Sequence, residues 1–130
     1  MAKDAMAAMH NNETPTFSVE IVIKKPLEDY DLLEVEAPTP RDVDPMLASQ
    51  GFKDLLDDAR AILERELEGR GLEIVQLTGA ICRDGDIHRP GIWLVVAENG
   101  ASPKNKEISP EAHARVAGAV EAVRSNLGLS

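Results

Sequence analysis

A change of apolar spacing at Gly69-Arg70-Gly71 constrains the fold of this chain more than any other feature. Before the glycines, apolar residues recur at the i, i+3, i+4, i+7 spacing of an amphipathic α-helix, and they are Phe52, Leu55, Leu56, Ala59, Ile62, Leu63 and Leu67. The glycines predict the end of this helix. Residues 72–82 then read as a strand that is apolar on both sides and is therefore expected to be central in a sheet.

Three further segments have strand patterns. Residues 17–25 place apolar side chains at every second position, and residues 92–97 are continuously apolar, which predicts a buried strand. Between residues 82 and 92, Asp84-Gly85 is a hairpin signal. Residues 32–36 predict a short edge strand, since acids and prolines flank it and discourage edge-to-edge aggregation.

Helix boundaries are marked by capping residues. Asp44-Pro45 suits a helix start, so the first helix is expected to begin there or to restart after Gly51. A second helix is expected from Ser109-Pro110-Glu111, where serine caps and proline takes the first position. Its apolar stripe is Val116, Val120, Val123 and Leu127, and Gly128 is expected to cap its end.

The element order is therefore β-β-α-β-β-α, which predicts an α+β fold. We expect a two-layer sandwich, with a mainly antiparallel sheet of about four strands and both helices on one face. Residues 1–15 are expected to form a flexible N-terminal arm, and residues 16–130 a single domain. The apolar residues on both sides of 72–82 and 92–97 do not suit an exposed sheet face, which favours an oligomer or a partner surface.

The charge is concentrated in one stretch. The net charge is −9, and residues 26–75 hold 14 of the 23 acidic side chains but only 5 of the 14 basic ones. Such a negative field repels nucleic acid and anionic membranes and attracts basic partners. No run of about 18 apolar residues predicts a membrane-spanning helix. The single cysteine, Cys82, rules out an intrachain disulfide and favours a reducing compartment.

Three groups of residues invite a chemical interpretation. Asp84, Asp86 and His88 alternate and could ligate a divalent metal, but a tight hairpin followed by a solvated strand face explains them better. A nucleophile–base pair of Cys82 and His88 is disfavoured, because a two-residue turn at Asp84-Gly85 would put them on opposite faces. An ion pair with Arg70 at the helix end accounts for Glu66 better than a functional buried carboxylate does.

The leading hypothesis is a small non-enzymatic interaction or assembly protein that acts through a sheet face and an acidic surface. It would be cytoplasmic, or virion-associated if of phage origin, and would form a homo-oligomer or join a larger assembly. We expect no cofactor, no metal, and no direct contact with nucleic acid or membrane. The partner-binding residues would be the acids Glu28, Asp29, Asp31, Asp54, Asp57, Asp58, Glu64 and Glu68.

Two alternatives stay open. One is an acidic inhibitor of a host enzyme that mimics nucleic acid, because acids in the 28–44 loop could join the helix acids in a phosphate-like array. The other is a small metal-dependent enzyme, for which the only candidates are Asp84, Asp86, His88 and Glu66. Acids on the outer face of an amphipathic helix also have a simpler explanation, since such a face is ordinarily solvated.

Overall fold

The computed structural model describes residues 14–99 and 107–129, so most of the expected N-terminal arm lies outside the described residues. The elements run in the order β1 (Thr16–Val22), the 3-10 helix η1 (Pro40–Val43), α2 (Asp44–Leu47), α3 (Gln50–Leu67), β2 (Leu72–Asp84), β3 (Ile87–Glu98) and α4 (Pro110–Leu127). The strands form an antiparallel sheet of order β1-β3-β2. The expected α+β class with an antiparallel sheet is confirmed.

Both ends of α4 follow the predicted capping chemistry, whereas α3 begins at a cap, Ser49, that was not predicted. Ser49 caps α3 by accepting a hydrogen bond from the Phe52 N–H at 3.2 Å, and Ser109 caps α4 by accepting one from the Ala112 N–H at 3.1 Å. Gly128 ends α4 in the left-handed conformation, at φ 64°. Asp44 opens a separate one-turn helix, α2, so the part of the chain that the structure describes has three α-helices rather than the two expected.

The strand expected over residues 32–36 is wrong. This segment forms turns, and only the neighbouring Ala37 pairs with β3, through two hydrogen bonds with His88 of 2.8 and 2.6 Å. The cause is local. The Asp31 and Glu34 carboxylates each accept the other's backbone N–H, at 2.8 and 2.9 Å, which closes a turn where the apolar pattern suggested an extended chain. The described sheet therefore has three strands and not four.

The central position expected for residues 72–82 is also wrong, because β3 occupies the centre and β2 an edge. Apolar residues fall on both sides of β2 partly because a bulge between Ile74 and Gln76 leaves Val75 56% exposed. Pairing between β1 and β3 ends at Gly91. The Ile23 N–H donates to the Pro90 carbonyl at 3.0 Å, but proline has no N–H to return the bond.

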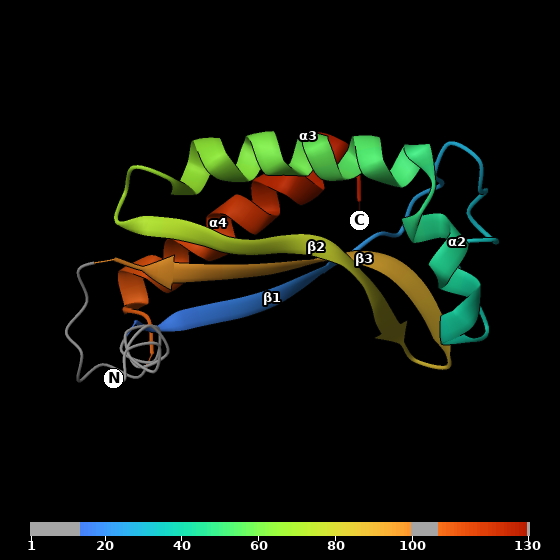
Figure 1. Ribbon diagram of the computed structural model, residues 1–130, viewed down its shortest axis with the longest axis horizontal. Helices are drawn as coiled ribbons and strands as arrows, with labels where there is room; N and C mark the ends of the chain where they lie inside the picture. The colour runs from blue at the N-terminus through green and yellow to red at the C-terminus, as the bar shows by residue number, and fades with distance from the viewer. Residues whose placement is uncertain (1–13, 100–106, 130) are drawn as a thin grey trace, which may run out of the picture.

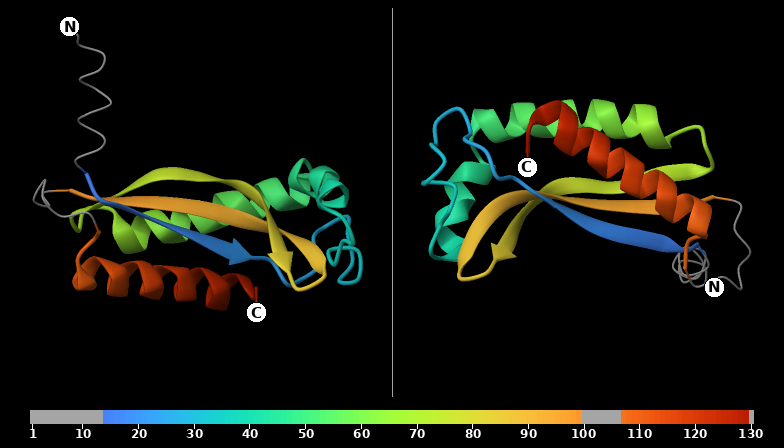
Figure 2. Two further views of the ribbon diagram at one scale, coloured as in Figure 1. Left: turned by 90° about the horizontal axis from the view of Figure 1, so that it is seen from below. Right: turned by 180° about the vertical axis from the view of Figure 1, so that it is seen from behind.

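The core lies between the sheet and the two long helices, which cover the same face (Figure 1). On this face β3 contributes Ile92, Leu94 and Val96, all fully buried. The α3 side chain Phe52 reaches Gly79 of β2, while the ring of Phe17 on β1 meets that of His113 on α4 edge-on at 4.6 Å. Seen from below, the strands lie in front of α3, and no helix of the described residues lies over the other face (Figure 2).

Candidate functional site

The uncovered face of the sheet has an apolar strip along its central strand. Trp93 stands between Glu20 of β1 and Thr78 of β2, and Val95 stands between Ser18 and Gln76. Trp93 and Val95 are both half-buried. A tryptophan is the residue type most enriched at the centres of protein interfaces, and here it lies in the middle of a face that no described helix covers.

This apolar strip is narrower than the apolar residues on both sides of segments 72–82 and 92–97 suggested. The flanking side chains of β1 and β2 on the uncovered face are polar and exposed, and they are Ser18, Glu20, Gln76 and Thr78. An apolar centre with a polar rim is the usual layout of a protein–protein contact. The face therefore exposes a short apolar strip rather than a second hydrophobic core.

The eight acids expected to bind a partner are all exposed. Within the described residues none of them takes part in an ion pair, so their charge is available to a partner. Four lie on the outer face of α3, opposite its buried stripe, and are Asp54, Asp57, Asp58 and Glu64, and Glu68 follows as the C-cap of this helix. The other three, Glu28, Asp29 and Asp31, lie in the loop that follows β1.

The loop acids and the helix acids meet at the start of α3. A Cβ atom placed on Gly51 would come within 2.7 Å of the Glu28 backbone nitrogen, so the loop packs directly on the first turn of α3. Gly51 is the residue that permits this approach. Glu28 and Asp54 consequently belong to one surface, which we call the acidic surface and define by the eight residues named above.

The metal-site and nucleophile–base interpretations of the hairpin residues, which the sequence disfavoured, do not find the geometry that they need among the described residues. In residues 14–99 and 107–129, no three His, Cys, Asp or Glu side chains come together closely enough to hold a metal ion. The hairpin turn is Gly85-Asp86 rather than Asp84-Gly85, which pairs His88 with Arg83 and Cys82 with Arg89. Cys82 and His88 still lie on opposite faces. Glu66 contacts Arg65 at 3.5 Å, not Arg70 as expected.

The polar cluster at the hairpin end is organised instead by Arg89. This residue is only 8% exposed, and its guanidinium reaches the Asp84 carboxylate at 2.8 Å and the Glu36 carboxylate at 3.3 Å. Asp84 is thereby engaged in holding a buried cation. The cluster ties the hairpin to the loop after β1 and has a structural role. The sequence did not indicate it because Glu36 is 53 positions away from Arg89 in the chain.

Cys82 is an inert thiol, and its chemistry can be tested directly. It is fully buried, and this burial raises the pKa of its thiol from 9.0 to about 11, with the negative charge of Glu20 adding to the rise. We expect native protein at pH 8 to react with iodoacetamide about 100-fold more slowly than the chain unfolded in guanidinium, since the thiolate is the nucleophile. Equal rates would contradict this.

The raised pKa of the Cys82 thiol also predicts that the stability of the protein depends on pH. The folded-state pKa lies above the unfolded value, so the thiol ionises first in the unfolded chain. The free energy of unfolding should be insensitive to this group below its unfolded pKa and should fall as the pH rises toward 11. Urea unfolding at several pH values, with Cys82→Ala as the control that lacks this component of the slope, measures the effect.

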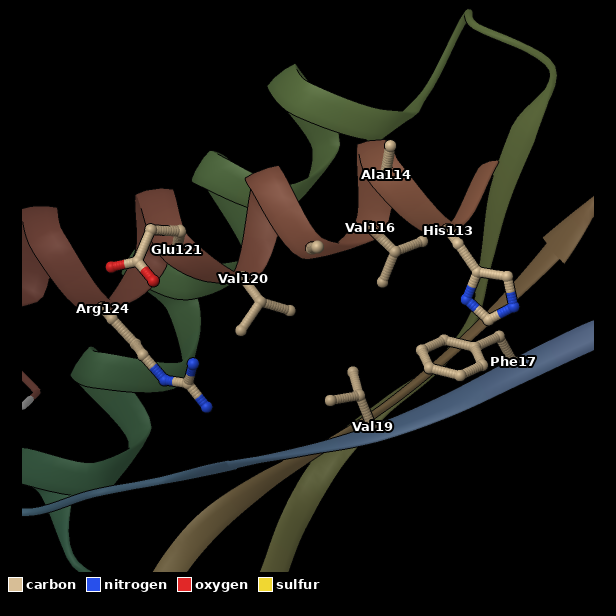
Figure 3. Close-up of a pocket in the computed structure, with 9 residues that line it drawn as sticks. Phe17, Val19, His113, Ala114, Val116, Val120, Glu121 and Arg124 are labelled. Carbon is tan, nitrogen blue, oxygen red and sulfur yellow. The ribbon is translucent and has the colours of Figure 1, made fainter. Parts of the chain in front are cut away.

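A groove between β1 and α4 was missed by the sequence reasoning. It has a volume of about 560 Å³ and is lined mainly by Phe17, Val19, Val116 and Val120. Figure 3 shows the two β1 side chains facing the two valines of α4, with Arg124 reaching from α4 toward β1. The alternation of β1 and the stripe of α4 were both visible in the sequence, but nothing local indicates that they leave a hollow between them.

Comparison with protein-family models, with curated proteins and with solved structures finds no match. Among the described residues, no helix combines the length and the apolar character that crossing a membrane requires.

Proposed function

We propose that this chain is a small non-catalytic interaction and assembly protein that self-associates, or joins a larger complex, through the uncovered face of its sheet. The observation that carries the proposal is the position of Trp93. This large ring lies half-buried at the centre of a face that no described helix covers, beside Val95 and inside a polar rim. Covering the two side chains would remove apolar surface from water, which is favourable.

The acidic surface has a second role in this proposal. Eight exposed carboxylates on a chain of net charge −9 create a field that speeds encounter with a basic partner and disfavours anionic ones. The uncovered sheet face would provide affinity, and the acidic surface would provide partner choice. We place the assembly in the cytoplasm, or in a virion if the chain is of phage origin.

Light scattering coupled to size exclusion tests the self-association. Val95→Lys puts a charge into the apolar strip, and we expect it to weaken association about ten-fold or more, because a charge buried without a partner is costly. Ser125→Lys adds the same charge at an exposed position of α4 and should leave association unchanged. A wild-type chain that is monomeric at every concentration would contradict self-association.

Salt separates this proposal from the acidic inhibitor. Association through an apolar strip should persist or strengthen in high salt, which screens the repulsion between two acidic copies. The inhibitor alternative is favoured by the contact of Glu28 with Gly51, which joins loop and helix acids in one array. The inhibitor alternative requires a monomer that binds a basic enzyme only in low salt. It also requires that the double variant Asp57→Lys/Asp58→Lys loses this binding.

A further inference from the structure

Besides the strip on the uncovered sheet face, two apolar features of the molecule have no partner among the described residues, and they lie in different parts of the fold. One is the groove between β1 and α4. The other is Leu32-Leu33, in the turn that replaces the expected edge strand. Leu32 is 45% exposed and Leu33 is 76% exposed, which makes Leu33 the most exposed of the large apolar side chains described.

The leucine turn is held in shape before any partner arrives. Asp31 and Glu34 close it with their reciprocal backbone hydrogen bonds, and the Glu36 N–H donates to the Leu33 carbonyl at 3.1 Å. On the C-terminal side Val35 is fully buried and anchors the turn in the core. A fixed turn loses little conformational entropy on binding, so two exposed leucines on it suit insertion into an apolar hollow.

One end of the groove matches this turn in charge as well as in polarity, although the lining also includes Glu121. Arg124 is half-buried, extends into the groove and has no ion pair within the described residues. Near its end of the groove, Lys25 donates to the Leu127 carbonyl at 3.0 Å, so a second cation lies there. The leucine turn carries Asp31 and Glu34 on either side of its leucines. A cationic groove end would therefore face an acidic turn.

We propose that the groove between β1 and α4 receives the Leu32-Leu33 turn of a second copy of this chain. The turn lies beside α2, at the end of the molecule away from the groove, so the contact forms between copies (Figures 1 and 2). Each copy presents one turn and one groove, and such a heterologous contact builds a ring or an open chain rather than a closed pair. The inference does not depend on the uncovered sheet face.

Single variants give the first test, made in the Val95→Lys background so that the sheet-face contact is removed. Leu33→Asp should abolish the remaining association, and Arg124→Glu should weaken it about ten-fold, since like charges would then meet in the contact. Glu121→Lys adds a cation to the groove lining and should tighten association, with a reversible dependence on concentration that an aggregating misfolded chain does not show. Sedimentation velocity over a range of concentrations measures all three.

Mixing gives the decisive test. Leu33→Asp has an intact groove and Arg124→Glu has an intact turn. At a protein concentration at which each variant alone is monomeric, an equal mixture should therefore form a dimer and nothing larger. The proposal is overturned if association is unchanged in both variants, or if the mixture is no larger than its components. An extended peptide of another protein would then be the remaining candidate occupant of the groove. If Val95→Lys leaves association unchanged and the mixture forms a dimer, only the sheet-face proposal is rejected.

Discussion

Gly91→Ala is expected to destabilise the protein by about 2–3 kcal/mol, because over-packing a filled buried site forces side chains and backbone to shift. A Cβ atom on Gly91 would overlap the sulfur of Cys82 and would lie 3.1 Å from the Ile21 carbonyl oxygen. Gly91 is on the central strand, between β1 and β2, so neither neighbour can move away without disturbing the sheet. Urea unfolding followed by circular dichroism measures the loss.

The cause can be separated from a general intolerance of side chains. Cys82→Ala removes the sulfur, and we expect it to cost about 1 kcal/mol on its own as a small core truncation. In the double variant Gly91→Ala/Cys82→Ala the new methyl group occupies the space of the sulfur. The double variant should therefore be more stable than Gly91→Ala alone, which is a favourable coupling between contacting residues. Additive losses would contradict the account.

Removing the partners of Arg89 is expected to do more harm than removing Arg89 itself. In Asp84→Asn/Glu36→Gln the guanidinium stays buried without a negative partner, and we expect a loss of about 2–4 kcal/mol, near the cost of breaking a buried ion pair from one side. The side chains of Asp84 and Glu36 are 39% and 34% exposed, so water already reaches the two carboxylates.

Arg89→Met provides the matched comparison. It replaces the buried cation with an apolar side chain of similar length and leaves two carboxylates that solvent can hydrate. We expect a loss of about 1 kcal/mol, since replacing a buried charge with an apolar group is often close to neutral. If Arg89→Met unfolds at a lower urea concentration than Asp84→Asn/Glu36→Gln, the two carboxylates depend on Arg89 more than Arg89 depends on them. The predicted order of the two stability losses is then wrong.

Features determined by local chemistry could be predicted from the sequence. The caps at Ser109 and Gly128 and the buried stripe of α3 depend on residues within a few positions of one another, and all are as expected. The error at residues 32–36 is also local. Asp31 and Glu34 have the three-residue spacing of a reciprocal cap, and the turn that they close replaces the edge strand predicted for residues 32–36.

Features determined by distant residues could not be predicted. The strand order β1-β3-β2 depends on whether β1 pairs with β2 or with β3, and no single residue in β2 or β3 specifies that pairing. The Arg89 cluster joins Glu36 to the hairpin across 53 positions of the chain. The groove exists only once α4 has packed over β1. The eight acids were predicted as partner-binding residues from their charge alone. The sequence did not indicate that loop and helix acids meet, and the contact at Gly51 shows that they do.

Trp93 is the only tryptophan of the chain, and it lies at the centre of the proposed interface, so its fluorescence reports directly on the central claim. Acrylamide quenching should be measured over a range of protein concentrations, for the wild type and for Ser125→Lys and Val95→Lys. We predict that quenching falls and the emission shifts to the blue as the concentration of wild type or Ser125→Lys rises, and that neither changes in Val95→Lys. Quenching of wild-type Trp93 that stays constant while light scattering shows assembly would contradict the claim, because the sheet face would then be uncovered in the assembled state.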